Sequence, residues 1–209
     1  MTTTPSPGDP GSNPIFKAIY DLVTSVPLSG EPTNSEPKSR AESIVELAAK
    51  KSSAIAAGMA LPPGPYGMLT VIPDLILCWR IQRQMVSDIA ACYGKHPILS
   101  QELMAYCLFR HGAETIVSEV VVRVGERYLV RRVPVLIFVH LIQKLSVRIS
   151  QRFLGRFVSR WIPVLGALAI GAYAYREAKL VGATTIDVFS RDIEVENKDG
   201  EIGDKSPEV

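Results

Sequence analysis

Apolar residues recur at steps of three, four or seven along most of the chain between residues 39 and 189, a period typical of amphipathic helices. Such steps occur within one predicted helix over residues 39–60, at Ile44, Leu47, Ala48, Ile55 and Met59. No set of strands with alternating apolar and polar residues and turn signals between them stands out. The sequence therefore predicts an all-α fold, a compact bundle of about six or seven helices with disordered termini.

Several of these helices have recognisable ends. Pro73 suits the first turn of a helix, and Gly94, where the same apolar pattern stops, is a natural C-cap. Ser100 is expected to cap the start of the next helix, which should reach about Arg110 and end at Gly112.

The stretch from residue 113 to residue 128 is rich in valine and could form a strand. Its length and a spacing of four among charged residues nevertheless favour a helix. The charged residues are Glu119, Arg123, Arg127 and Arg131. Beyond them, Pro134 and Pro163 are expected to begin or kink two further helices, of which the last should reach about Phe189.

The ends of the chain differ in composition from its middle. Residues 1–40 hold seven of the fifteen prolines, so we expect a disordered tail there, interrupted by a short amphipathic patch over Ile15–Val23 that could dock on the body or on a partner. Residues 190–209 are acidic and polar and are expected to form a second disordered tail. The helical domain is then predicted over residues 41–189, and the 47% of hydrophobic residues suffices for a core there.

Membrane association is suggested by apolar runs that are too short to cross a bilayer. Trp161–Tyr175 has no charged residue, but Arg160 and Arg176 bound it, and at 1.5 Å per residue it would reach only about 22 Å. The run Val133–Ile142 is shorter still. Such runs fit either buried core helices or partial insertion at a membrane surface. Because Met1–Gly8 lack the features of a secretory signal, we expect a cytoplasmic, peripherally membrane-associated protein.

A basic block occupies the middle of the chain. Residues 110–160 hold ten Lys and Arg against three Asp and Glu, and no acid occurs from residue 127 to residue 176. Within it, cations recur at every fourth position and fan over one side of a helix beside Leu, Val and Phe: Lys144, Arg148, Arg152, Arg156 and Arg160. This pattern predicts an interfacial helix that binds anionic lipid or another anionic partner, although a solvated face would look the same. Nucleic acid is disfavoured, because no nucleic-acid-binding motif accompanies the charges.

Catalytic signatures are absent from the sequence. It contains no nucleophile elbow, Walker loop, dinucleotide fingerprint or zinc-protease motif, so no catalytic residue and no cofactor is predicted. His96, His111 and His140 are scattered without clustered carboxylates, which argues against a metal site. His140 lies in an apolar run and is expected to be a core histidine with its hydrogen bonds satisfied.

Two groups of small residues are predicted to pack inside the protein. The three cysteines, whose number and spacing suit neither disulfides nor a metal, should be buried, reduced thiols: Cys78, Cys92 and Cys107. Small residues at helical spacing should allow close helix packing, or hold an oligomeric scaffold together: Gly166, Ala167, Gly171, Ala174, Ala178 and Gly182.

Two groups of motifs together resemble the EcsC-like family over about residues 57–186. The first group comprises Ala57-Gly58, Pro63-Gly64, Ile72-Pro73-Asp74-Leu75, Trp79-Arg80-Ile81-Gln82, Ile89-Ala90 and Tyr93-Gly94, and the second is Ile162-Pro163-Val164-Leu165-Gly166-Ala167 followed by Gly171. The resemblance implies a helical protein, often encoded beside membrane transport or secretion components, without an established enzymatic activity. Asp74 and Arg80 carry over as motif positions of unknown role, whereas Lys95-His96 and Tyr175 depart from the pattern of the family.

A binding pocket is the alternative site that these motifs suggest. Asp74 sits in an otherwise apolar run, so its carboxylate either fixes the start of a helix or handles a ligand or a proton, with Arg80 as anion partner. The candidate pocket and motif residues are Gly64, Gly67, Asp74, Arg80, Tyr93 and Gly94.

The leading functional prediction is a non-enzymatic, membrane-associated helical protein. It would bind anionic lipid or a membrane-protein partner through the basic helix over residues 144–160, with a possible link to transport or secretion. The alternatives are an enzyme or small-ligand-binding domain with its pocket near Asp74, and a homo-oligomeric scaffold.

Overall fold

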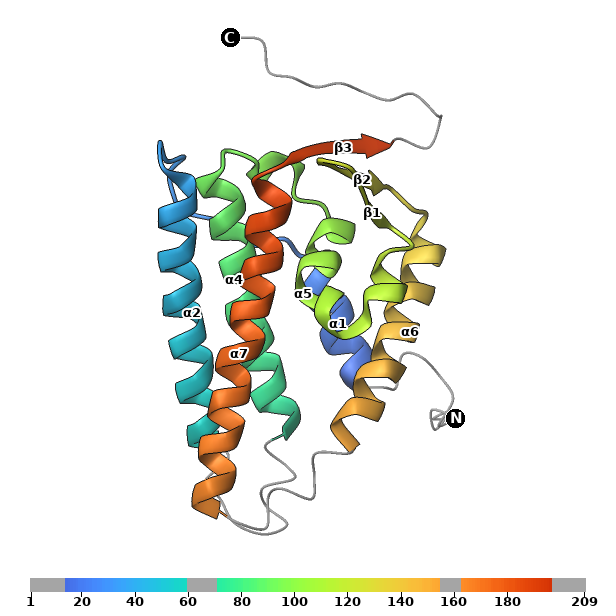
Figure 1. Ribbon diagram of the computed structural model, residues 1–209. Coiled ribbons are helices and arrows are strands. Elements are labelled where there is room, and N and C mark those ends of the chain that lie inside the picture. Colours follow the sequence, from blue (N-terminus) through green and yellow to red (C-terminus); the bar gives the residue numbers. More distant parts are fainter. Residues whose placement is uncertain (1–13, 60–70, 155–162, 197–209) are drawn as a thin grey trace.

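The computed structural model describes residues 14–59, 71–154 and 163–196 (Figure 1). Most of them are helical, in α1 (Pro14–Thr24), α2 (Pro37–Met59), α4 (Val71–Cys92), the 3-10 turn η2 (His96–Ile98), α5 (Gln101–Val117), α6 (Val135–Leu154) and α7 (Pro163–Phe189). The prediction of a mostly helical protein is confirmed. The prediction of a purely all-α fold is wrong, since β1 (Val121–Val124), β2 (Arg127–Arg131) and β3 (Asp192–Glu196) form a small sheet.

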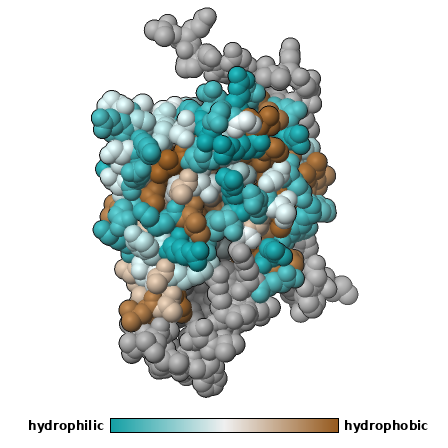
Figure 2. Space-filling view, in the orientation of Figure 1, coloured by the Kyte–Doolittle hydropathy of each residue, from teal (hydrophilic) through white to brown (hydrophobic). Residues whose placement is uncertain are grey.

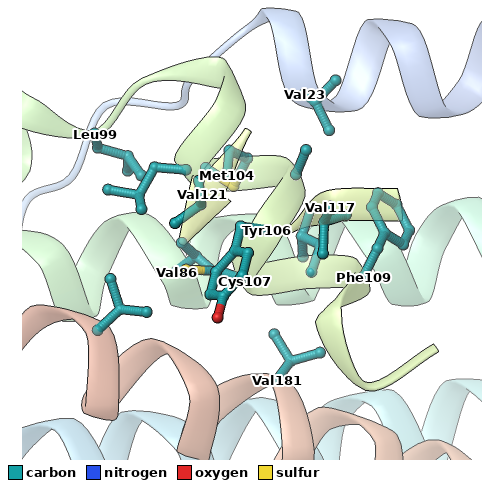
Figure 3. Close-up of a cluster of buried hydrophobic side chains, with 14 of the residues drawn as sticks. Val23, Val86, Leu99, Met104, Tyr106, Cys107, Phe109, Val117, Val121 and Val181 are labelled. Atoms are coloured by element: carbon teal, nitrogen blue, oxygen red, sulfur yellow. The ribbon is translucent and has the colours of Figure 1, made fainter. Parts of the chain in front are cut away.

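Helix α5 lies in the centre of the described structure and is buried on all sides. All eight residues from Glu102 to Phe109 are buried, which a helix with only one apolar stripe could not achieve. Figure 3 shows Tyr106 and Cys107 of α5 among Val86 of α4 and Val181 of α7. Helices α1, α4, α6 and α7 therefore pack around α5, whereas α2 packs against α4 and α7.

Helices α2 and α7 pack side by side because small residues let their backbones approach. A Cβ on Gly171 would lie 3.1 Å from Ala57 Cβ, and one on Gly182 would lie 2.4 Å from Val45 Cγ2. At the edge of the same contact, Tyr175 Oη donates a hydrogen bond of 2.9 Å to a carboxylate oxygen of Glu46. The predicted close packing is confirmed for these glycines, and it joins two helices of the same chain.

The predicted caps on either side of η2 are confirmed. Gly94 has φ +69°, and the Lys95 and Gly94 amides donate to the carbonyls of Ala90 and Ala91, which is a Schellman C-cap. Ser100 accepts a hydrogen bond of 3.3 Å from the Leu103 amide, as expected of an N-cap.

The predicted helix over residues 113–128 is wrong. Helix α5 continues past Gly112 to Val117, with non-helical dihedrals at Ala113, and the chain then turns into a hairpin. Gly125, at φ +61°, occupies the first position of its two-residue turn, where glycine is favoured. The preference of valine for strands thus outweighs the four-residue charge spacing, and Arg123 falls on β1 whereas Arg127 and Arg131 fall on the central strand β2.

The acidic strand β3 completes the sheet by pairing in parallel with β2. Ion pairs join the two strands, with Arg127 Nη1 2.5 Å from Glu194 Oε1 and Arg131 Nε 3.3 Å from Glu196 Oε2. The predicted disordered tail over residues 190–209 is therefore wrong for its first residues, because a basic strand offers them both hydrogen bonds and opposite charge.

The predicted disordered tail over residues 1–40 is also wrong in its described part, whereas the docking of its amphipathic patch on the body is confirmed. The amphipathic patch forms α1, and its residues Ile19, Leu22 and Val23 are buried in the core. The chain then follows α4, where Ser87 Oγ donates a hydrogen bond of 2.7 Å to the Pro27 carbonyl. The burial of three apolar α1 side chains stabilises an ordered segment although the residues around it are rich in proline.

Candidate functional site

Helix α6 lies at the edge of the described structure, where it packs against α1 and α5 (Figure 1). Its inner side buries Phe138, Leu141, Ile142 and Leu145 in the core. Its outer side, here called the α6 face, consists of the exposed residues Leu136, Ile137, His140, Lys144, Val147, Arg148 and Gln151. These positions recur at mostly three- and four-residue steps, so they share one surface along the helix.

Large apolar side chains stand out on the α6 face. Leu136 is 78% exposed, Val147 55% and Ile137 52%. Val135, just before them, is 65% exposed. Figure 2 shows an apolar patch at the right-hand edge of the molecule, at the level of the upper end of α6 in Figure 1. Single exposed apolar residues are common, but a group on one helix marks an interaction surface.

The sequence left the run Val133–Ile142 open between a buried core helix and partial insertion at a membrane surface. In the structure the run is only partly buried, because Phe138 faces the core whereas Leu136 and Ile137 are exposed. One prediction about this region needs correction. His140 is exposed, contrary to the predicted core histidine, and its Nδ1 lies 3.3 Å from the Leu136 carbonyl oxygen of its own helix.

The charges on the α6 face are positive. Lys144 Nζ lies 2.9 and 3.1 Å from the two carboxylate oxygens of Glu119, which follows α5. Arg148, one turn further along, is exposed and makes no ion pair within the described part of the chain. Since α6 itself contains no acid, Arg148 contributes an unneutralised charge beside the apolar residues.

A shallow groove of about 410 Å³ runs along the contact between α5 and α6. Ile116 of α5 and Val147 of α6 supply its apolar wall. Its other lining residues are Gln143, Lys144, Arg148 and Gln151. The groove therefore combines an apolar surface with two cations and two amides.

The predicted basic face is described only in part. Lys144 and Arg148 are exposed on α6, as expected of that face. Arg152 belongs to α6, but its side chain lies outside the described residues, as do Arg156 and Arg160 altogether.

The predicted pocket residues are not brought together by the described structure. Asp74 belongs to the first turn of α4, where its side chain is not described, and Gly64 and Gly67 lie outside the described residues. Arg80 is exposed on α4. Gly94 follows the far end of the helix, about 30 Å from Asp74 at 1.5 Å per residue. The role of Gly94 in the described structure is to cap α4.

Tyr93 has a packing role beside that cap. It is half-buried, and burial raises the pKa of its phenol. Its hydroxyl is buried without a hydrogen-bond partner among the described residues. It lies next to Cys92 and far along α4 from Arg80, so the described residues give no pocket that unites the motif.

Sequence reasoning missed the groove and did not say which residues of the apolar run are exposed. Leu136 and Ile137 lie in the run Val133–Ile142, which fitted either a buried core helix or partial insertion at a membrane surface. Three successive apolar residues, Val135 to Ile137, span about 200° around a helix, so on a helix at the surface of the fold some of them face outward. Ile116 and Glu119 carried no signal, because their approach to α6 depends on the turn after α5.

A second polar cluster connects α5 with α7. His111 Nε2 hydrogen-bonds one carboxylate oxygen of Glu177, and Tyr173 Oη donates to the other. His111 Nδ1 is buried and has no partner among the described residues. An imidazole paired with a carboxylate can move protons, but His111 is not among the residues that line the groove between α5 and α6.

A third cluster fastens the sheet to α7. Tyr128 Oη donates a hydrogen bond of 2.6 Å to Asp187 Oδ2, and Arg123 Nη1 and Arg191 Nε lie 3.6 and 2.8 Å from the same carboxylate. Burial, together with the hydrogen bond to Asp187, raises the pKa of Tyr128. Arg110 lies over the Tyr106 ring, 5.5 Å from its centroid. These groups satisfy one another, which is typical of a structural network.

Metal and thiol chemistry find no support in the described part of the chain. No three His, Cys, Asp or Glu side chains there are grouped so that they could hold a metal ion. All three cysteines are buried and unbridged, as predicted, and burial raises the pKa of Cys107 to about 12. A thiol with so high a pKa is a poor nucleophile at neutral pH.

Comparison with known proteins adds no assignment: no family model, no curated protein and no solved structure matches the chain. Among the described residues, no helix combines the length and the apolar composition needed to cross a bilayer. The α6 face, with its groove, is therefore the candidate site that the arrangement of side chains itself singles out.

Proposed function

We propose that this protein binds the surface of anionic membranes from one side, through the α6 face. The observation that carries the proposal is the joint exposure of Leu136, Ile137 and Val147 with the unpaired cation Arg148 on one acid-free helix. A helix that lies in a membrane interface needs both features, since its apolar side chains enter the acyl boundary while its cations meet anionic headgroups.

The apolar residues supply the larger share of the expected binding energy. Burying one Leu, Ile or Val side chain fully gives about 1.5–3 kcal/mol, and these side chains are already half or more exposed, so partial insertion of three could give several kcal/mol. Each cation near an anionic surface adds about 1 kcal/mol. Lys144 adds less, because Glu119 already neutralises it. Affinity should thus depend on insertion, and lipid selectivity should depend on Arg148.

Membership of the EcsC-like family is part of the same proposal and rests on the motifs around Asp74 and Gly171. Its association with membrane transport or secretion components agrees with a membrane-surface role.

The test is co-sedimentation of the purified chain with phosphatidylcholine vesicles, with and without phosphatidylglycerol, at low and high salt. Leu136→Gln removes an apolar contact, and Leu47→Gln on α2, at another exposed leucine, is its matched control. Arg148→Gln removes the unpaired cation, and Arg176→Gln, at an exposed arginine of α7, is the control.

Binding that requires phosphatidylglycerol, weakens with salt and falls with the two α6 variants alone would support the proposal. If the control variants lose as much vesicle binding as the α6 variants, the binding depends on net charge or overall hydropathy and not on the α6 face, which would contradict the proposal. Failure of the wild-type chain to bind any vesicle would overturn the proposal and favour a protein partner for the α6 face.

A further inference from the structure

The α5–α6 groove differs from the rest of the α6 face because it is concave and chemically mixed. Its lining surface is mostly apolar, with Ile116 and Val147 among the residues that form it, and Gln143, Gln151 and Arg148 also border it. Its volume of about 410 Å³ is within the range of small-molecule sites, about 300–1,000 Å³.

The two cations of the groove are not equivalent. Both carboxylate oxygens of Glu119 are held by Lys144, at 2.9 and 3.1 Å, so this ammonium is already partnered. Arg148 has no ion pair within the described residues, and its own helix contains no acid. A guanidinium presents two parallel N–H donors, a geometry that fits two oxygens of one phosphate.

The amides of Gln143 and Gln151 complete the chemistry of the groove. They lie on either side of Val147 along α6, about one turn from it. Each amide can donate to a phosphate oxygen and accept from a hydroxyl group. The groove therefore suits a molecule with an apolar part, and the phosphate of that molecule would meet the guanidinium of Arg148 beside it.

We infer that the groove binds a single anionic phospholipid, with its phosphate on Arg148 and the first methylenes of an acyl chain against Ile116 and Val147. This inference rests on the proposed function, because the same α6 face must meet the membrane for a lipid to enter. The inference goes beyond the proposed function because it gives the α6 face a saturable site for one lipid headgroup. General attraction between cations and an anionic surface would not saturate in this way.

The test uses short-chain lipids below their micelle concentration, so that no membrane surface is present. Dihexanoyl phosphatidylglycerol is titrated into the full chain, and methyl NMR signals of Ile116 and Val147 report on the groove. Dihexanoyl phosphatidylcholine and inorganic phosphate are titrated separately, since the first lacks net charge and the second lacks acyl chains.

The expected result is a saturable shift of both methyl signals with phosphatidylglycerol, at least tenfold weaker with phosphatidylcholine. Arg148→Gln should weaken binding by about tenfold or more, as loss of a charged hydrogen bond implies. Arg148→Lys should restore only part of it, because the two parallel donors are lost. Arg176→Gln, on α7, should leave the affinity unchanged.

Three outcomes would overturn the inference: no saturable shift, equal binding of the two lipids, or binding of inorganic phosphate as tight as that of phosphatidylglycerol. Vesicle binding without short-chain lipid binding would overturn the groove site alone. Short-chain lipid binding without vesicle binding would overturn the proposed membrane role and leave a site for a free lipid.

Discussion

Gly182 of α7 faces Val45 of α2 so closely that a Cβ on Gly182 would lie 2.4 Å from Val45 Cγ2. Gly182→Ala should therefore force the two helices apart and lower the free energy of unfolding by about 1–3 kcal/mol. Urea unfolding followed by circular dichroism measures this. Gly58→Ala, where a Cβ would meet nothing within 4 Å, is the matched control and should cause no loss. Equal destabilisation by both variants would contradict the close contact.

The ion pair between Glu119 and Lys144 restrains the charge of the α6 face. Glu119→Gln would release Lys144 and should strengthen binding to phosphatidylglycerol vesicles by about fivefold, the equivalent of about 1 kcal/mol for one added charge. Vesicle titration at low salt measures the change. Glu42→Gln changes net charge equally at an exposed position of α2 and should have a smaller effect. If both variants strengthen binding alike, the attraction is not localised to α6.

The buried thiol of Cys107 should make the protein less stable at alkaline pH. Burial raises its pKa to about 12, above the value of about 8.5 of an unfolded chain. The unfolded state therefore loses this proton first, and the stability that is fully present below about pH 8.5 declines as pH rises toward 12, by about 1.4 kcal/mol per pH unit.

Urea unfolding between about pH 8 and pH 10 under reducing conditions tests this, with Cys107→Ala as the comparison. The variant loses some packing energy at every pH. Its free energy of unfolding should nevertheless decline less steeply with pH than that of the wild type, and the difference in slope should approach about 1.4 kcal/mol per pH unit. Parallel curves for the two proteins would show that Cys107 does not ionise differently in the folded state.

Arg83 ties the end of α1 to α4. Its Nη1 donates to the Ser25 carbonyl at 3.1 Å and to Ser25 Oγ at 2.8 Å, and burial lowers its pKa. Arg83→Met should lower stability by about 1.5–3 kcal/mol and speed hydrogen exchange in Pro14–Thr24. Arg80→Met, at an exposed arginine of the same helix, should leave that exchange unchanged. Slow exchange in α1 of the Arg83 variant would contradict this role.

The fold was most predictable where local chemistry decides it. Gly94 and Ser100 cap helices through hydrogen bonds to residues within five positions, and the sequence contains all the participants. The hairpin after α5 was missed because valines fit both a helix and a strand in isolation. Pairing of Tyr128 and Val130 with β1 decides between them, and the two buried side chains then enter the core.

The candidate site was predictable in its charges, and its apolar run was noted without saying which residues face solvent. Lys144 and Arg148 belong to a segment without Asp or Glu, residues 127–176, which the sequence shows directly. Whether Leu136 faces the core or solvent depends on which side of α6 meets α1 and α5, and that is a property of the assembled core. The groove depends further on where α5 ends, since Ile116 lies one residue before that end.

The pairing of α2 with α7 also determines when the protein can fold. The hydrogen bond from Tyr175 to Glu46 joins residues 129 positions apart, so the entropy of a long loop is lost before this contact contributes. During synthesis, the side of α2 that packs against Gly171 and Gly182 stays exposed until α7 has been made. We therefore expect docking of α7 to be a late step, and folding to be slower than in bundles that pair only neighbouring helices.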